Sequence, residues 1–113
     1  MRYFTLEDFN CKETGENEMC PDFLARLDEL RHRCGFPFII TSGYRSPRHS
    51  IEKRKPKAGT HAQGIAADIR ALHGSQRYII QKHAYEMGFK GIGVHKAFIH
   101  VDDRETTAVS WPY

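Results

Sequence analysis

The clearest hydrophobic pattern along the chain lies between residues 21 and 34. Apolar residues recur there at intervals of three or four, at Phe23, Leu24, Leu27, Leu30 and Cys34. This spacing places them on one face of a helix. Pro21 suits the first turn of a helix, and Gly35 suits its C-terminal stop. The pattern therefore predicts an amphipathic helix over residues 21–34.

Two further helices are predicted from end signals. Thr5, followed three residues later by Asp8, has the form of a capping box, which predicts a short helix over residues 5–9. Ser75 is a suitable cap for a helix that runs to residue 87, where Gly88 would stop it.

The strands are short and lie in the middle and last parts of the chain. Residues 38–41 are mostly β-branched and apolar, which indicates a buried strand. Residues 65–70 alternate in polarity, with Ile65, Ala67 and Ile69 on one face and Asp68 on the other. Residues 91–95 and 98–102 predict a hairpin.

The order of these elements decides the fold class. Two helices, two strands, a helix and two more strands predict an α+β fold, with a small, mostly antiparallel sheet flanked by helices. Residues 42–60 form a long loop in this scheme. Loops longer than about 12–15 residues in a compact domain are usually functional or mobile.

Length and composition bound the class of protein. With 113 residues, 40% hydrophobic and 27% charged, the chain fits one domain over residues 1–113 and excludes a disordered chain, a collagen and a coiled coil. No apolar run approaches the ~20 residues of a membrane helix, so we expect no membrane partner. The N-terminus mixes acids with apolar residues, unlike a secretory signal. We therefore expect synthesis in the cytoplasm and, for any action outside, delivery by another agent.

The three cysteines form no recognisable framework. Their number is odd and they lack C-x-x-C spacing, which argues against a disulfide scaffold and against a cysteine-rich zinc site. Cys34 ends an apolar helical stripe and is interpreted as a buried thiol. Whether Cys11 and Cys20 meet across a loop stays open.

The net charge of +3 is unevenly distributed. Residues 1–30 carry −5, residues 31–60 carry +7 and residues 61–113 carry +1. The basic stretch at 45–57 indicates either an anionic partner or a solvated loop. A nucleic-acid partner is disfavoured, because no recognition helix or aromatic-bearing sheet motif accompanies the charge.

Chemistry is concentrated at three positions. His61 and Asp68 lie seven residues apart, and Gly64 between them allows a bend that brings both side chains to one spot. His100 lies on the polar face of the last predicted strand, together with Asp102. Two histidines and one carboxylate form a ligand set for catalytic zinc, which lowers the pKa of a bound water to about 7. The alternative is a helix cap beside an unrelated surface acid.

Three motifs in order carry a resemblance to a known family. They are Thr41-Ser42-Gly43-Tyr44-Arg45-Ser46-Pro47, His61-x2-Gly64-x-Ala66-x-Asp68, and Gly91-x-Gly93-x4-Phe98-x-His100-x-Asp102-x-Arg104. Together they resemble the zinc D-Ala-D-Ala carboxypeptidases and related phage endolysin peptidases, which share a fold with the hedgehog signalling domain. The resemblance spans nearly the whole chain.

The resemblance implies roles for individual residues. His61, Asp68 and His100 match the family's zinc ligands, and Arg45 matches an arginine that binds substrate near the scissile bond. A guanidinium can grip a carboxylate or stabilise an oxyanion, which fits that role. Tyr44 is a further candidate for substrate contact, with a structural loop aromatic as the alternative.

The chain also departs from the family pattern. Many relatives carry an acidic general base three residues before the last ligand, where this chain has Ala97. Some carry a histidine five residues before it, which here is His95. In a two-residue hairpin His95 would lie diagonal to His100, at roughly 7–8 Å, so we interpret it as the acid/base, with a surface histidine as the alternative.

Two other positions bear on the site. Relatives often have a substrate-holding serine where this chain has Gly59, so no such contact is assigned. Asp102 is a candidate to orient a ligand histidine, with a surface acid at a strand end as the alternative.

The resemblance implies a zinc peptidase that cleaves an amide in the peptide stem of peptidoglycan. Its type would be D-Ala-D-Ala carboxypeptidase or L-Ala-D-Glu endopeptidase, and its origin a phage or prophage lysin that acts on the cell wall or periplasm as a monomer. The competing hypothesis is a zinc-containing binding module without catalysis, which the alanine at position 97 favours.

Overall fold

A five-stranded sheet forms the centre of the computed structural model, which describes all 113 residues. Its strands are β1 (Ile40–Ser42), β2 (Ala66–Arg70), β3 (Gly91–Val94), β4 (Phe98–Asp102) and β5 (Val109–Pro112). Their order across the sheet is β1-β2-β4-β3-β5. All neighbours are antiparallel except β3 and β5, which are parallel. The predicted α+β fold with a mostly antiparallel sheet is thus confirmed.

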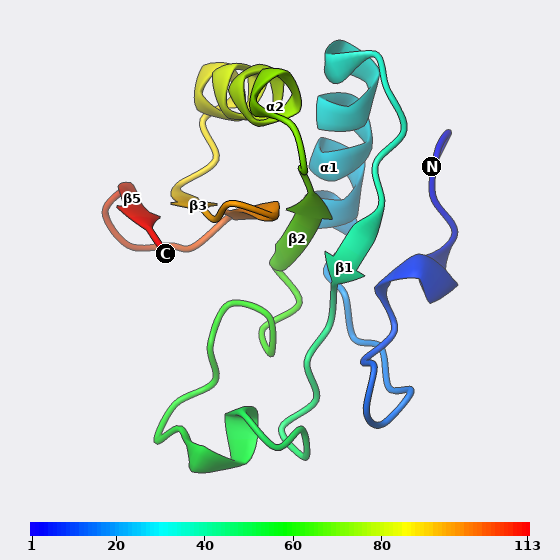
Figure 1. The fold of residues 1–113 in the computed structure, drawn as a ribbon. Coiled ribbons are helices and arrows are strands. Elements are labelled where there is room, and N and C mark those ends of the chain that lie inside the picture. Colours follow the sequence, from blue (N-terminus) through cyan, green and yellow to red (C-terminus); the bar gives the residue numbers. More distant parts are fainter.

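Two helices pack together beside this sheet. They are α1 (Pro21–Cys34) and α2 (Gly74–Met87), and a short 3₁₀ helix, η1 (Leu6–Phe9), precedes them. In Figure 1 both long helices lie above the strands, while the connection from β1 to β2 extends away from them at the other end of the molecule. That connection contains a second 3₁₀ helix, η2 (Glu52–Arg54), within the segment predicted as a loop.

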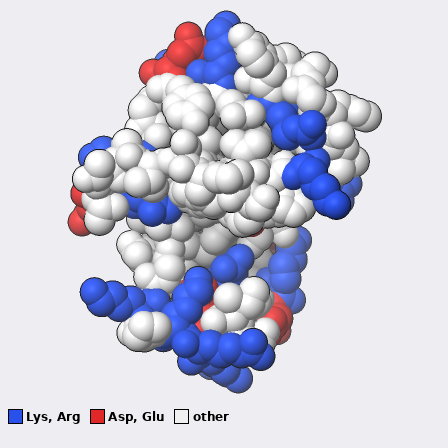
Figure 2. Space-filling view, turned by 60° about the vertical axis from the view of Figure 1, so that its left-hand side comes forward, with Lys and Arg blue, Asp and Glu red and all other residues white.

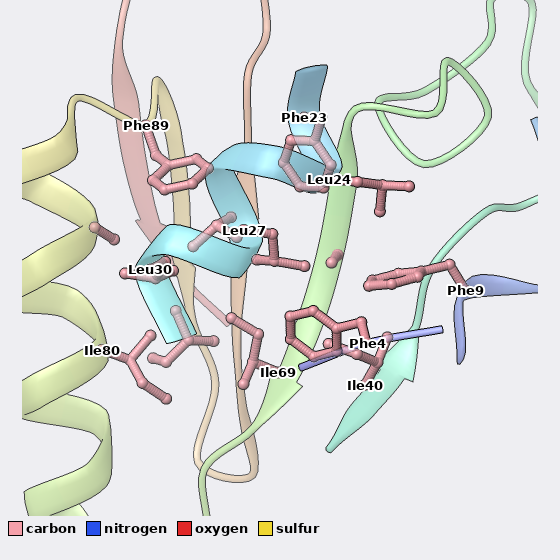
Figure 3. Packing of buried hydrophobic residues seen from close by; sticks show 14 of the residues in the cluster. Phe4, Phe9, Phe23, Leu24, Leu27, Leu30, Ile40, Ile69, Ile80 and Phe89 are labelled. Atoms are coloured by element: carbon pink, nitrogen blue, oxygen red, sulfur yellow. The ribbon is translucent and has the colours of Figure 1, made fainter. Parts of the chain in front are cut away.

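The hydrophobic core fills the space between the helices and one face of the sheet. From α1 it takes the apolar stripe of the sequence, including Leu27 and Leu30, which are fully buried. Ile80 of α2 and Ile69 of β2 meet this stripe (Figure 3). The 3.6-residue period of the helix and the two-residue period of the strand therefore deliver their apolar positions to one core.

The opposite face of the sheet carries the polar side chains. In β4, Ile99 and Val101 belong to the core, whereas His100 and Asp102 do not. In β2, Ala67 and Ile69 belong to the core, and Asp68 does not. Because successive side chains of a strand point to opposite faces, the polar residues of both strands share the face that the helices leave uncovered.

The boundaries of several elements differ from those predicted. Helix α2 begins two residues earlier than expected, at Gly74, and His73, in an extended conformation, occupies the N-cap. The prediction that Ser75 caps this helix is therefore wrong, because Ser75 already lies inside the first turn. Strand β1 begins at Ile40 instead of Phe38, whose ring packs against the core outside the sheet.

Two further observations complete the fold. All three cysteines are free, so Cys11 and Cys20 do not form a disulfide, and Cys11 is buried. Cys34, which the sequence predicts to be a buried thiol, is only partly buried, and this burial raises the pKa of its thiol to about 11. No helix in the structure has the length and apolar character required to cross a membrane.

Candidate metal centre

A single row of residues runs across the polar face of the sheet. Asp68 of β2 is paired with His100 of β4, which is paired with Gly93 of β3, which in turn is paired with Trp111 of β5. Residues paired across neighbouring strands project to the same face. The row therefore brings a carboxylate, an imidazole and an indole together, although 43 residues separate Asp68 from Trp111 in the chain.

His61 joins this row from the turn before β2. Gly64, with φ of +75°, shapes that turn in a conformation that favours glycine, as the sequence predicted. The imidazole Nδ1 lies 2.8 Å from the carbonyl oxygen of Gly43. A carbonyl oxygen only accepts, so Nδ1 carries the hydrogen and Nε2 presents a lone pair. That Nε2 lies 3.3 Å from Oδ1 of Asp68.

The ring of His100 is held by the carboxylate of Asp102 on the side that faces away from Asp68. Its Nε2 lies 2.7 Å from Oδ2 of Asp102, which has no exposed surface. An ionised carboxylate only accepts, so Nε2 carries a hydrogen. The other ring nitrogen, Nδ1, lies 3.0 Å from Oδ1 of Asp68. Asp102 is thus a buried partner of His100, and the alternative of an isolated surface acid is excluded.

These contacts test whether the site fits a cation. Nε2 of His61, Nδ1 of His100 and a carboxylate oxygen of Asp68 lie within 4.8 Å of one another, and all three residues are buried. With the outer nitrogens bonded to acceptors, three electron-pair donors face each other, and only a proton or a metal ion between them relieves the repulsion. Nitrogen and carboxylate donors of this kind suit zinc. The residues therefore fit a metal ion, as predicted.

The contacts among these side chains also determine the pKa values of Asp68 and His100. Burial alone would raise the pKa of Asp68. A proton held between this carboxylate and the His100 or His61 ring makes a hydrogen bond to it, which outweighs burial and holds the pKa of Asp68 at about 2. Burial opposes protonation of His100, yet its bonds to Asp102 and Asp68 raise its pKa. Asp68 is therefore a carboxylate at neutral pH, the form that binds a cation.

Asp102 is in turn held by an arginine. Arg104 donates to it from Nε at 2.9 Å and from Nη2 at 2.7 Å, and its backbone N–H donates at 3.1 Å. Burial would raise the pKa of Asp102, but its bonds from His100 and Arg104 lower the pKa well below the usual range. Gly91 makes room for this carboxylate, since a Cβ there would lie 2.2 Å from it. The orientation of His100 thus rests on an ionised, fully bonded acid.

The metal-binding group, which consists of His61, Asp68 and His100, lines a hollow of about 300 Å³. Three cationic residues line this hollow, Arg45, Lys55 and Arg104. Three aromatic residues line it as well, Phe98, Trp111 and Tyr113, and the Arg104 guanidinium lies over the Trp111 ring. A second hollow, of about 540 Å³, adjoins it and shares Lys55, Thr60 and Arg104 with it. The site is therefore an open groove lined by both cationic and aromatic side chains.

The positive charge continues beyond the groove. Lys and Arg gather at the lower end of the molecule in Figure 2, where Figure 1 places the connection between β1 and β2. Arg48, Lys53, Arg54 and Lys57 are exposed there. A groove bordered by such a region attracts anionic ligands.

Arg45 lies in the groove as expected, but Tyr44 does not. The Arg45 side chain is 17% exposed and donates from Nη1 to Glu52 at 3.4 Å, while lining the hollow. Tyr44 is part of the hydrophobic core, and its hydroxyl donates to Glu18 at 3.1 Å. Because its ring is buried in the core, Tyr44 is not available to a substrate, and the alternative of a structural loop aromatic holds.

His95 lies opposite Phe98 in the hairpin, as expected, since its N–H donates to the Phe98 carbonyl at 3.0 Å. Its ring stacks on the Phe98 ring with centroids 4.4 Å apart and does not line the hollow. Its Nδ1 accepts the Ala97 N–H at 3.0 Å, which leaves Nε2 as an N–H donor. In this arrangement the ring has no free lone pair directed to a substrate.

The main residues that the sequence did not indicate come from β5. Its segment, Val-Ser-Trp-Pro, is only four residues long and ends in proline, which is uncommon within strands, so the sequence analysis includes no strand here. Its Trp111 ring lies 5.1 Å from the His100 ring, and a Cβ on Gly93 would lie 2.7 Å from the indole. The glycine opposite an aromatic residue was the available signal, but it depends on knowing the strand pairing.

Comparison with known proteins agrees with this geometry. The model of the family Peptidase M15 matches residues 2–102, which covers nine-tenths of the chain and all the candidate metal ligands, and ends before β5. No curated protein matches the chain. From the metal-binding group and this match, we conclude that the chain belongs to the Peptidase M15 family, a family of zinc D-Ala-D-Ala carboxypeptidase-like metallopeptidases.

Proposed function

We propose that this protein is a zinc-dependent peptidase that hydrolyses an amide bond in the peptide stem of bacterial peptidoglycan. Its type is D-Ala-D-Ala carboxypeptidase or L-Ala-D-Glu endopeptidase. The observation that carries the proposal is the convergence of His61, Asp68 and His100 at the base of an open groove. Membership of the family supports the reaction class.

The protein's own residues prepare the reaction in three ways. When bound, zinc supplies a Lewis acid for the scissile carbonyl and lowers the pKa of a coordinated water. Asp102 and Gly43 fix the orientation of the two histidines, so that the ligand nitrogens need no rearrangement. Arg45 uses one of its donors on Glu52 and keeps the others for a carboxylate or an oxyanion of the substrate.

The residue that transfers the proton is not yet oriented for this role in the structure. The carboxylates of Asp68, Asp102 and Glu52 are already bound to histidine or cationic partners. His95 therefore remains our candidate for proton transfer, and in this role its ring must leave the Ala97 N–H and turn towards the groove. The hairpin end, where neither Lys96 nor Ala97 is buried, leaves space for that movement.

We further propose a phage or prophage lysin that acts as a monomer on the cell wall or periplasm after its release. The likeness of its motifs to the endolysin peptidases supports this origin. The basic surface beside the groove supports an anionic cell-wall substrate.

Mass spectrometry of defined muropeptides after incubation with the zinc-loaded protein tests the proposal. A mass loss of one D-alanine identifies a carboxypeptidase, and release of the stem from its L-alanine identifies an endopeptidase. His61→Ala, which removes a ligand, serves as the inactive control. Cleavage that persists in His61→Ala, or no cleavage of any muropeptide by the wild type, refutes the proposal.

A second candidate function is a zinc-containing module that binds peptidoglycan or protein without cleaving it. Two observations favour it: position 97 carries no acid, and His95 has its lone pair engaged by the backbone. Stoichiometric zinc binding, together with retention on purified cell walls and no new muropeptide, would establish this alternative. Comparison of wild type with His95→Ala then separates the two, because only a peptidase loses turnover while it keeps wall binding.

A further inference from the structure

The ammonium group of Lys55 lies at the junction of the two hollows. Its side chain lines both the hollow over the metal-binding group and the adjoining one. It is 39% exposed, so ligand and solvent can reach it. Its Nζ lies 2.7 Å from Oε2 of Glu52, which fixes the position of a side chain that is ordinarily flexible.

Glu52 is a buried acid that contacts the two groove-lining cations Lys55 and Arg45. Its side chain is only 2% exposed, and it accepts hydrogen bonds from three groups. These are Lys55 Nζ at 2.7 Å, the Gly59 N–H at 3.1 Å and Arg45 Nη1 at 3.4 Å. One carboxylate is thus shared by two cations, so Lys55 and Arg45 together carry one positive charge that Glu52 does not balance. Burial alone would raise the pKa of Glu52, but these bonds lower it, so the acid is ionised at neutral pH.

Gly59 provides the space that Lys55 occupies. A Cβ at this position would lie 2.8 Å from Lys55 Nζ and 3.5 Å from Oε1 of Glu52. A residue with a side chain would therefore displace the ammonium from Glu52. The glycine and the lysine act as one arrangement, in which the cation fills the space that a side chain at position 59 would take.

We propose that Lys55 and Arg45 together bind a carboxylate of the substrate, and that Glu52 is the residue that positions both cations. This inference rests on the peptidase function proposed above and adds the group of the substrate that the groove recognises. A substrate carboxylate would be the second anion beside Glu52 and would balance the charges of Lys55 and Arg45. Lys55 has two further N–H donors and Arg45 has four, so the donors needed for this contact are free.

The single tryptophan of the chain offers a binding assay that does not depend on turnover. Trp111 lines the same hollow, so its fluorescence in a stopped-flow instrument reports binding before cleavage. The probe is the stem pentapeptide L-Ala-γ-D-Glu-L-Lys-D-Ala-D-Ala, either unmodified or with one of its two carboxylates converted to an amide. Zinc-loaded wild type, Lys55→Met, Lys55→Arg and the control Lys53→Met are compared.

We expect Lys55→Met to raise the Kd for the unmodified peptide about tenfold, the usual effect of losing one charge-assisted hydrogen bond. Lys55→Arg restores binding. Lys53→Met removes an exposed charge that forms no ion pair with Glu52, so it leaves binding close to wild type. Amidation of the recognised carboxylate weakens binding by wild type and causes no further loss in Lys55→Met. Equal binding by wild type and Lys55→Met, or an equal loss in Lys53→Met, overturns the proposal.

Two variants test the positioning role of Glu52. Glu52→Gln and Gly59→Ser both release Lys55, so we expect a raised KM with little change in kcat and in zinc stoichiometry. A merely structural role would lower zinc binding and kcat together, and that result overturns the assignment. If the wild type binds none of the three peptides, the peptidase function itself fails, whereas binding that is insensitive to Lys55 refutes only the carboxylate site.

Discussion

Replacement of Asp102 by asparagine tests the support of the metal centre most directly. The Asp102 carboxylate is fully buried and accepts hydrogen bonds from His100 Nε2, from two guanidinium nitrogens of Arg104 and from the Arg104 backbone. Asparagine has the same shape but offers one acceptor oxygen and one NH₂ donor. In either orientation, the NH₂ group therefore faces a donor from His100 or from Arg104.

The expected losses of stability and of zinc affinity follow from these contacts. Breaking a buried charge pair by removing one partner costs about 3–5 kcal/mol. The Arg104 side chain is 26% exposed and recovers part of its hydration, so we expect the free energy of unfolding to fall by about 2–3 kcal/mol. Because His100 loses its fixed orientation, we expect zinc affinity to fall about 10- to 100-fold, as for other residues that hold metal ligands.

Competition with a chromophoric chelator measures the zinc affinity, and urea unfolding of the zinc-free protein measures stability. Asp103→Asn is the matched control, since Asp103 pairs with Arg26 at 3.0 Å, away from the metal-binding group. It should leave zinc affinity unchanged and lower stability by less than about 1 kcal/mol. If Asp102→Asn loses stability but binds zinc as tightly as the control does, Asp102 does not orient His100 for the metal.

Three other predictions follow from the structure. Gly93→Ala places a Cβ 2.7 Å from the Trp111 ring, so we expect a shifted tryptophan emission and a loss of about 1–3 kcal/mol in urea unfolding; Gly74→Ala, with no atom closer than 3.7 Å, should show neither. The pKa of Asp28, which burial would raise, is lowered by its arginine partner, so the folded state binds fewer protons than the unfolded state. Stability of the zinc-free protein should therefore fall as pH drops through and below about 4, and fall less in Asp28→Asn; an equal fall in both excludes this contribution. Zinc at about 100 times its Kd should add about 2.7 kcal/mol and raise the melting temperature, an effect that a chelator reverses and that His61→Ala lacks; a zinc-induced rise that survives in His61→Ala would contradict the ligand set.

Much of the fold could be predicted because its signals are local. The helix over residues 21–34 has the bounds expected from its apolar spacing, its proline and its glycine. The strands around Asp68 and His100 follow from alternation, which also assigned these side chains to the face opposite the core. A periodicity of two or 3.6 residues is read from neighbours in the chain, so it survives without knowledge of the rest.

The sequence could not determine the surroundings of side chains whose orientation depends on distant partners. Tyr44 follows the glycine of a recognisable motif, but whether it enters the groove or the core depends on the packing of the N-terminal segment. His95 has the right position in the hairpin, yet the backbone of Ala97 and the ring of Phe98 decide where its lone pair points. Neither contact leaves a trace in the local pattern.

The sequence by itself determined the α+β class, the two faces of the sheet and the group of His61, Asp68 and His100, because periodicity and motif spacing are properties of short segments. Only the tertiary structure decided that β5 pairs with β3 and brings Trp111 beside the metal-binding group. It also decided that the buried Glu52 gathers two cations in the groove. The physical reason is that strand pairing and ion pairing in the interior are set by which surfaces remain to be covered once the core has formed.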